Sequence, residues 1–486
     1  MDGKMANWGL WAEHQEKSLS QKFESIKIKS ANDVELAVKI AAKNSTENSV
    51  VSGKPDEPEI SLAEESLMRK FLHTKLVRTF QNVEVERKNP NSPLYSVKSF
   101  EELNLRPELL RGVYEMGFNA PSKIQETTVP TLLANPAQNL IAQSQSGTGK
   151  TAAFLLAGLN RVDPHKRFPQ LLILSPTYEL AEQTGCVAKQ MTKFCSKIGI
   201  RLAVRGETLS RGEKIWEQVI IGTPGKMLDW SRRFKLFDLK KIKVFVLDEA
   251  DIMIATQGHH DQSIRIHNQL SPECQMMMFS ATYTEEIIDF AKLIVPNAVV
   301  LRLKKEDENL NNIKQYYVFC RNIEEKFNAL SNIYGVLSVG QAIIFCQTRR
   351  AAAWLSENMR KVGHAVALLS GDLSIEQRIA VIKTFRDAKV KVLITTNVCA
   401  RGIDIEQVTL VVNFDLPVDQ YGNVDCQTYL HRIGRTGRFG KSGIAINMVD
   451  GKRTMDMLEK IEDCFKRKIT RLDAEDVDQI EKLEEN

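Results

Sequence analysis

Short apolar runs alternate with segments whose apolar residues recur at helical spacing, from Phe100 almost to the C-terminus. Because strands that are buried on both faces are continuous apolar runs, this alternation predicts an α/β protein with parallel sheets covered by helices on both faces. Side chains with a function are then expected at the carboxyl ends of the strands. The predicted strands are Asn139–Ala142, Leu171–Leu174, Val219–Ile221, Val244–Leu247 and Met276–Phe279, followed by Ala342–Phe345, Ala365–Leu369, Val392–Ile394, Leu410–Val412 and Ala445–Met448.

A charged segment, residues 304–312 (KKEDENLNN), separates the two sets of strands and is suited to a linker. We therefore predict two α/β lobes, 96–303 and 313–472, with a cleft between them. A single large domain is the alternative, but the chain is longer than one hydrophobic core usually supports. Residues 1–95 form a polar arm that we expect to be mostly flexible, and residues 473–486 form an acidic tail.

One helix is predicted within the arm, over residues 61–78. Ser61 and Glu64 form an S-x-x-E capping box, and Met68, Phe71 and Leu72 follow on one face at helical spacing. Such a helix either packs permanently on the first lobe or is a regulatory segment that restrains the cleft. The sequence leaves both interpretations open.

The composition is that of a globular protein, with 43% hydrophobic and 26% charged residues among 486. No run of 18 apolar residues predicts a membrane-spanning helix, and the N-terminus lacks the pattern of a secretory signal. The eight cysteines form no CxxC pair or Cys/His cluster, which argues against a zinc site or a disulfide scaffold. We expect reduced thiols in a cytosolic or nuclear protein.

The positive charge is concentrated in the middle of the chain. Residues 96–469 contain 50 basic and 40 acidic residues, whereas the arm is balanced at 14 of each and residues 470–486 contain 2 basic and 7 acidic residues. A positive body permits a polyanionic partner but does not prove one.

A phosphate-binding loop is predicted in Ala142–Thr151 (AQSQSGTGKT), between an apolar strand and a helical run. Its residues Ser146–Gly149 can turn tightly and direct backbone N–H groups at phosphate oxygens. Lys150 adds a cation for the phosphates and Thr151 a hydroxyl for Mg²⁺. Ser144 stands where the strict pattern has glycine.

A carboxylate centre is predicted in Lys243–Asp251 (KVFVLDEAD), where a buried strand leads to Asp248 and Glu249. Asp248 is expected to bind Mg²⁺ and Glu249 to deprotonate the attacking water. Taken alone, the pair could be a solvated helix N-cap. Together with the phosphate loop it indicates a catalytic site.

The second half contains a basic motif, His431–Gly440 (HRIGRTGRFG), in which Arg432, Arg435 and Arg438 recur every three residues. This spacing places them on nearly one side of a helix or tight turn. A basic surface stripe is the alternative, but guanidinium groups arriving from a second lobe suit the charge that develops on a transferring phosphoryl group. The motifs thus predict an ATPase site divided between the lobes.

The order of GTGKT, LDEAD, SAT (Ser280–Thr282), ARGID (Ala400–Asp404) and HRIGRTGR resembles the DEAD-box RNA helicases over residues 96–450. The resemblance implies two tandem RecA-like lobes with an interlobe ATP/RNA cleft, an RNA-stimulated ATPase activity, and ATP and Mg²⁺ as cofactors. Gly117–Gln125 resembles the family's Q motif. Gln125 would then read the adenine edge and Phe100 would stack on its ring, although a buried structural glutamine is the alternative for Gln125.

The resemblance also assigns roles to further residues. Asp404 would reach the ribose, Arg435 and Arg438 would be the arginine fingers, and Asp251, Ser280, Thr282 and His431 would couple the lobes. The predicted nucleotide-binding residues are Phe100, Gln125, Ser144, Gln145, Ser146, Gly147, Thr148, Gly149, Lys150, Thr151, Asp404, Arg435 and Arg438. The predicted RNA contacts are Pro176, Thr177, Thr223, Gly225, Thr348, Arg349, Arg378 and Thr395. Such groups suit a sugar–phosphate track without base reading.

At several positions the sequence departs from the common pattern of the family and resembles one subfamily instead. Tyr178 replaces the usual Arg in PTYEL, Arg205 replaces a Gly, Lys226 replaces Arg in TPGK, and residues 418–428 form a long loop. These features resemble the subfamily that acts in messenger-RNA export at the nuclear pore, which includes a germ-cell relative. This implies messenger ribonucleoprotein RNA, a cytoplasmic-face nucleoporin and an inositol-hexakisphosphate-dependent activator as partners of a monomer. It also implies location in cytoplasm and nucleus, concentrated at the cytoplasmic face of the pore.

The sequence therefore favours an ATP-dependent RNA helicase that binds single-stranded RNA, locally unwinds duplexes and remodels ribonucleoprotein complexes. One alternative is an ATP-locked RNA clamp with little unwinding. Another is a catalytically silent RNA-binding scaffold, against which the intact Lys150, Asp248, Glu249, Arg435 and Arg438 argue.

Overall fold

The computed structural model describes strand β1 (Val83–Glu86) and residues 97–485, apart from 145–146, 208, 210–211, 257, 304–311, 338–339, 398–406, 420 and 438–441. All of these residues belong to one compact unit, Ser61–Asn486. The predicted helix 61–78 and the predicted site residues Gln145, Ser146, Asp404 and Arg438 lie outside the described residues.

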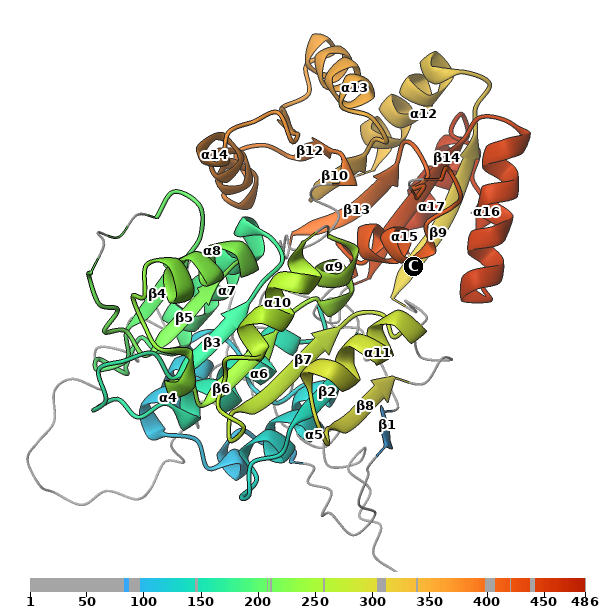
Figure 1. The fold of residues 1–486 in the computed structure, drawn as a ribbon. Helices are drawn as coiled ribbons and strands as arrows, with labels where there is room; N and C mark the ends of the chain where they lie inside the picture. The colour runs from blue at the N-terminus through green and yellow to red at the C-terminus, as the bar shows by residue number, and fades with distance from the viewer. Residues whose placement is uncertain are drawn as a thin grey trace, which may run out of the picture. The chain divides into compact units, whose positions relative to one another are not determined.

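The first lobe is built on an eight-stranded sheet in the order β1-β8-β2-β7-β6-β3-β5-β4 (Figure 1). Neighbouring strands are parallel, except that β1 runs antiparallel to β8 with Val83 opposite Leu303. The strands are β2 (Leu140–Gln143), β3 (Leu171–Leu174), β4 (Ile200–Ala203), β5 (Val219–Gly222), β6 (Val244–Leu247), β7 (Gln275–Ser280) and β8 (Val299–Leu303).

Helices cover both faces of this sheet. On β3, Leu171 and Ile173 belong to one hydrophobic core and Leu172 and Leu174 to the other, as the two-residue period of a doubly buried strand requires. The helices are η1 (Glu101–Leu103), α4 (Pro107–Glu115), α5 (Lys123–Leu133), α6 (Lys150–Arg161), α7 (Tyr178–Met191), α8 (Pro224–Leu228), η2 (Asp229–Arg233), η3 (Leu239–Lys241), α9 (Ala250–Ala255), α10 (His259–His267) and α11 (Glu285–Ile294).

The second lobe repeats the plan with a seven-stranded parallel sheet in the order β11-β12-β10-β13-β14-β9-β15. Here Ile344 faces one core and Ile343 and Phe345 the other. The elements are β9 (Ile313–Phe319), α12 (Ile323–Val336), β10 (Gln341–Phe345), α13 (Arg349–Lys361), β11 (Val366–Leu369), α14 (Ile375–Arg386), β12 (Val392–Thr395), β13 (Val408–Asn413), α15 (Cys426–Ile433), β14 (Gly443–Val449), α16 (Lys452–Phe465), β15 (Thr470–Arg471) and α17 (Val477–Glu485). The predicted fold class is confirmed.

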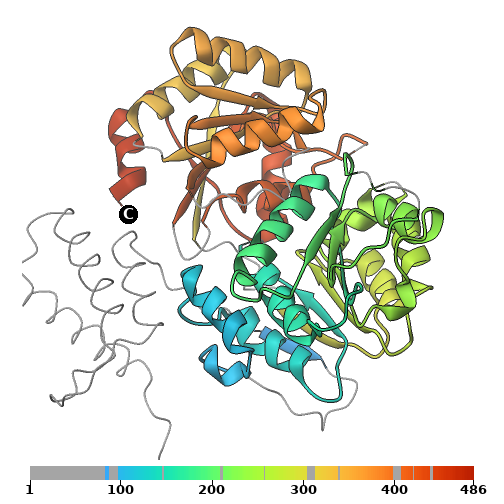
Figure 2. The same cartoon turned by 90° about the vertical axis from the view of Figure 1, so that its left-hand side faces the viewer.

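The segment that we set apart as an acidic tail contains α17, at whose end Figure 2 marks the C-terminus. Leu472, Ile480 and Leu483 are buried in the core of the second lobe, and α17 packs against α12. Asp478 and Glu481 lie on the exposed face of an amphipathic helix, so composition alone hid its apolar face.

The pattern of apolar runs missed strands that mix polar and apolar residues. On β9 (IKQYYVF) buried positions alternate with half-exposed ones, and β4 (IRLA) is a largely half-buried edge strand. β1 was missed because it lies in the polar arm. Edge strands need only one apolar face, and this weakens their signal in the sequence.

The expectation of reduced thiols is wrong for two cysteines. Cys426 at the start of α15 and Cys464 near the end of α16 form a disulfide with a Cα–Cα distance of 6.8 Å. They are 38 residues apart in the sequence, and only the packing of the two helices brings them together. Among the described residues, no helix has the length and apolar character that crossing a membrane requires.

Candidate active site

The phosphate loop follows β2 and leads into α6. Gly147 and Gly149 have φ values of +81° and +100°, which glycine adopts without strain. Lys150 is only 6% exposed, and its Nζ donates to the carbonyl oxygen of Ser144 at 2.7 Å. The Ser144 hydroxyl in turn contacts the Thr148 hydroxyl. The lysine ammonium is thus held against the start of its own loop.

Gln125 ties the predicted Q motif to this loop. Its Oε1 accepts from the Ser122 backbone N–H at 3.0 Å, and its Nε2 donates to the Gly149 carbonyl oxygen at 3.0 Å. A Cβ built on Gly149 would lie 2.4 Å from Gln125 Nε2, so glycine is required there by contact as well as by φ. Gln125 therefore has the structural role that we kept as an alternative. The amide has a second N–H and a second lone pair, so its contact with adenine stays a prediction.

The carboxylate centre lies two strands from the phosphate loop. The sheet order β2-β7-β6 places the end of β7 between them, where Ser144 N–H donates to the Ser280 carbonyl oxygen at 2.9 Å. Glu249 Oε1 lies 3.9 Å from Lys150 Nζ. Both motifs therefore meet at one edge of the sheet, as the rule for parallel strands predicts.

Asp248 and Glu249 are almost fully buried and next to each other. Burial, followed by the charge of Glu249, raises the pKa of Asp248 to about 7. Glu249 has a φ of +50°, an uncommon conformation for a residue other than glycine, which sets its backbone at the sharp turn between β6 and α9. Such strain is typical of functional sites.

The carboxylate pair fits a divalent cation. Glu249 Oε2 is buried without a hydrogen-bond partner among the described residues. A cation beside Asp248 would offset the burial and the charge of Glu249, which together raise the pKa of Asp248. Oxygen ligands are those that Mg²⁺ prefers. Asp248 and Thr151 are the residues that would hold it.

Asp251 connects the two lobes. His431 Nε2 on α15 lies 2.8 Å from Asp251 Oδ2, and Ser280 Oγ donates to Asp251 Oδ1 at 3.2 Å. These are contacts that we expected for His431 and Ser280. The expected contact of Thr282 is not made, because its hydroxyl is buried without a partner among the described residues. Glu249, Asp251 and His431 together could also hold a metal ion, but these hydrogen bonds already satisfy Asp251.

Arg432 and Arg435 do not share a helix, because α15 ends at Ile433 between them. Arg432 is fully buried and donates to Asn413 Oδ1 at 3.0 Å and to the Asp415 carbonyl oxygen at 2.7 Å. Arg435 lies beyond the helix, is 3% exposed, and donates from Nε to the His431 carbonyl oxygen at 3.0 Å. Arg432 is therefore a structural residue, whereas Arg435 stands next to the residue that contacts Asp251.

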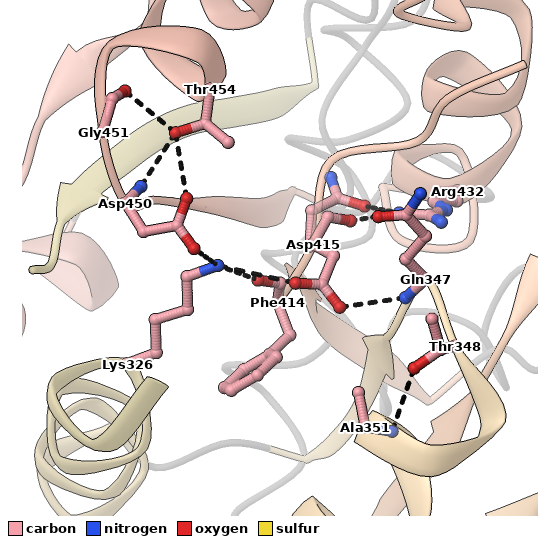
Figure 3. A network of polar contacts seen from close by, with 11 residues as sticks. Lys326, Gln347, Thr348, Ala351, Phe414, Asp415, Arg432, Asp450, Gly451 and Thr454 are labelled. Atoms are coloured by element: carbon pink, nitrogen blue, oxygen red, sulfur yellow. Dashed lines mark hydrogen bonds and ion pairs between the residues drawn. The ribbon is translucent and has the colours of Figure 1, made fainter. Parts of the chain in front are cut away.

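A buried lysine that the sequence analysis missed organises this part of the second lobe (Figure 3). Lys326 Nζ on α12 lies 2.7 Å from Asp450, 3.5 Å from Asp415 and 3.1 Å from the Phe414 carbonyl oxygen. Asp415 also accepts from the Gln347 backbone N–H at 3.0 Å, next to Thr348. One indication in the sequence that this lysine is buried was its position on an otherwise apolar face of a helix. Its partners are about 90 residues or more away and could not be identified.

The predicted RNA contacts follow strand ends at the same edges of the two sheets. Thr177 Oγ1 caps α7 and Thr348 Oγ1 caps α13, while Thr223 and Gly225 stand at the start of α8. Pro176 is buried beside Thr177. Capping is the ordinary role that such residues have at a helix start, where the first backbone N–H groups have no partner within the helix.

Other predicted contacts are engaged within the protein. Thr395 is fully buried and its hydroxyl donates to the Thr396 carbonyl oxygen at 3.1 Å. Arg349 pairs with Asp372. Arg378 Nη1 lies 3.1 Å from Glu179 Oε1 on α7, which makes an ion pair from the second lobe to the first. Phe100 is 1% exposed and packs edge-on against Tyr114 in the core, so its ring presents no free face for stacking in this structure.

Comparisons with known proteins agree with these motifs. The model of the DEAD/DEAH box helicases matches residues 122–290, and that of the helicase conserved C-terminal domain matches residues 325–440. The chain is 56% identical to human ATP-dependent RNA helicase DDX19A over 98% of its own length and 99% of that protein.

Solved structures of a yeast protein are similar throughout the two lobes. Dbp5 of S. cerevisiae bound to RNA and ADP BeF3 is 48% identical, with a TM-score of 0.75, over 80% of this chain and 98% of that one. A Dbp5 variant bound to Nup159, Gle1, IP6 and ADP is 47% identical, with a TM-score of 0.61, over 78% and 98%.

Proposed function

Because this chain belongs to the DEAD-box ATP-dependent RNA helicases, in the subfamily that acts in messenger-RNA export, we propose a specific division of labour for its residues. The protein uses ATP. The single observation that carries the proposal is the contact between His431 and Asp251. This contact joins His431, within the basic motif of one lobe, to the carboxylate motif of the other, in which Glu249 lies 3.9 Å from Lys150 of the phosphate loop.

In hydrolysis, a water oxygen forms a bond to the γ-phosphorus while the bond from that phosphorus to the β,γ-bridging oxygen breaks. Glu249 accepts the proton of the water, and its unpartnered Oε2 is the atom that would take it. Lys150, Arg435 and Arg438 stabilise the charge on the phosphoryl oxygens. Thr151 and Asp248 would hold Mg²⁺, which would supply further neutralisation of the phosphate charge when bound.

RNA binding and hydrolysis are coupled through the joint between the lobes. RNA that contacts Thr177 and Thr223 on the first lobe and Thr348 on the second favours the closed arrangement, because its phosphates are then shared by both lobes. Closure places Arg435 and Arg438 at the nucleotide. A bent strand cannot stay paired, so short duplexes separate locally and bound proteins are displaced.

The partners and location follow from the subfamily. Structures of Dbp5 with RNA, and with Nup159, Gle1 and IP6, support messenger ribonucleoprotein RNA, a cytoplasmic-face nucleoporin and an IP6-dependent activator as partners of this chain. On this basis the protein acts as a monomer at the cytoplasmic face of the nuclear pore.

The test is the ATPase rate with and without single-stranded RNA, repeated with single-stranded DNA, together with displacement of a short duplex. RNA-specific stimulation with strand displacement supports the helicase. Stimulation without displacement would identify the RNA clamp, and no ATPase activity under either condition would identify a silent scaffold.

A further inference from the structure

The first lobe has an open groove of about 830 Å³ that is separate from the candidate active site. It is lined by residues that precede strands, among them Phe168 before β3, Trp216 before β5 and Lys241 before β6. These strands are parallel, so their starts share one edge of the sheet, whereas Lys150 and Asp248 follow strand ends at the opposite edge. We call this site the edge groove; its charged and aromatic lining includes Arg167, Lys214, Trp216, Arg232, Lys235 and Lys241.

The edge groove is strongly positive. Five basic side chains line it against one carboxylate, that of Asp238. All five are exposed, and none of them forms an ion pair with any described residue. Lys214 Nζ donates only to the Lys235 carbonyl oxygen, at 3.4 Å. Cations that are close together and uncompensated raise the local concentration of a polyanion.

An indole stands among these cations on a fixed support. Trp216 is 56% exposed, whereas its neighbour Ile215 is 4% exposed and donates its backbone N–H to the Leu236 carbonyl oxygen at 3.2 Å. Leu236 and Phe237 are themselves buried. The Arg167 guanidinium lies 5.6 Å from the centre of the Trp216 ring. An exposed aromatic face within a basic groove is the arrangement that binds single-stranded nucleic acid by stacking.

We propose that the edge groove binds single-stranded RNA outside the interlobe track, with a base stacked on Trp216 and phosphates at Lys214, Arg232 and Lys235. This rests on the proposed function only in that RNA is the substrate. A nucleotide matches both features of the groove. Its flat base can stack on the indole, and its phosphate can pair with the cations. An acidic peptide would match the cations alone. An RNA that reaches from the interlobe track to the edge groove gains affinity from both sites, because the second contact is intramolecular.

The experiment measures binding of the full-length chain to fluorescent oligouridine in the presence of ADP·BeF3, as a function of salt. Trp216→Ala is expected to weaken binding about tenfold. Lys214→Ala/Lys235→Ala is expected to reduce the slope of log affinity against log salt by about 0.7 for each lost phosphate contact. The loss of affinity and the reduction in salt slope should both become smaller as the oligouridine is shortened, since a short strand cannot occupy the interlobe track and the edge groove together. Trp216→Phe, which keeps a flat ring, should recover most of the affinity even if Trp216→Ala folds poorly.

Lys292→Ala is the matched control, because Lys292 is an exposed lysine on α11 of the same lobe and outside the groove. It should bind RNA as the wild type does. Wild-type affinity and salt slope in both groove variants would overturn the inference. So would loss of binding to polyglutamate without loss of RNA binding, which would assign the groove to an acidic polypeptide. Absence of RNA-stimulated ATPase activity in the wild type would instead contradict the proposed function, so the two failures are distinct.

Discussion

His431 Nε2 lies 2.8 Å from Asp251 Oδ2, and both side chains are about 1% exposed. Asp251 belongs to the carboxylate motif of the first lobe and also accepts from Ser280, whereas His431 stands on α15 of the second lobe. A hydrogen bond shielded from water in this way is stronger than an exposed one and costly to leave unmade. The joint between the lobes therefore lies within the active site itself.

Removal of this contact should uncouple RNA from hydrolysis. His431→Ala leaves the Asp251 carboxylate without its interlobe partner, at a cost of about 1–3 kcal/mol to the closed state. We expect the RNA-stimulated rate to fall about tenfold or more and the RNA-free rate to change much less. His431→Gln, whose amide can donate to Asp251, should recover part of the stimulation. Equal losses in both rates would contradict a coupling role.

Glu249→Gln should retain ATP and RNA binding and lose turnover. The amide keeps the shape of the side chain but cannot accept the proton of water, so kcat is expected to fall about 10²- to 10⁴-fold. Nucleotide binding and single-turnover hydrolysis separate the two effects. Glu273→Gln is the control, because Glu273 is exposed in a turn of the same lobe. Hydrolysis near the wild-type rate would remove Glu249 from the role of base.

Arg435→Ala should lower kcat far more than ATP affinity. Arginine fingers act mainly in the transition state and are worth on the order of 10³-fold or more. The same result is expected for Arg438→Ala. Steady-state ATPase assays with separate nucleotide-binding measurements test this, with the exposed Arg471→Ala as control. If a variant bound ATP weakly but kept the full kcat, the substituted arginine would not be an arginine finger.

Lys326→Met should destabilise the second lobe and weaken RNA binding. The substitution removes the ammonium that holds Asp415, whose carboxylate fixes the turn at Gln347 and Thr348. We expect the free energy of unfolding to fall by about 1–3 kcal/mol, measured by urea denaturation. Lys361→Met, at an exposed lysine, should change it by less than about 0.5 kcal/mol. A stable variant with normal RNA affinity would show that this network positions nothing.

The arm should restrain the ATPase, if the predicted helix 61–78 acts as a regulatory segment. Strand β1 pairs with β8, so the truncation must stop before Val83 to leave the sheet intact. Deletion of residues 1–80 is expected to raise the RNA-free ATPase rate severalfold, because the arginines of the second lobe would then reach the nucleotide without RNA. An unchanged or lower rate would contradict the restraint. A lower thermal unfolding midpoint in the same variant would then favour a helix packed permanently on the first lobe.

Local chemistry was readable from the sequence. The alternation of apolar runs predicted both doubly covered sheets, and GTGKT and LDEAD identified Lys150, Asp248 and Glu249 at strand ends, where the structure places them. These features depend on neighbours along the chain: a buried strand, a tight turn and the residue that follows it. Strands and helices appear in the sequence as apolar residues that recur with a period of two or 3.6 residues, so such local features can be predicted directly.

The pairing of distant residues was decided only by the tertiary structure. It brings His431 to Asp251 across 180 positions, buries Arg432 instead of exposing it, and places Lys326 between two aspartates. It also assembles the edge groove from residues that precede separate strands. In the sequence each of these residues is an ordinary polar side chain. Its partner is determined by strand order and helix packing, which depend on the free energy of the whole lobe and leave no local pattern.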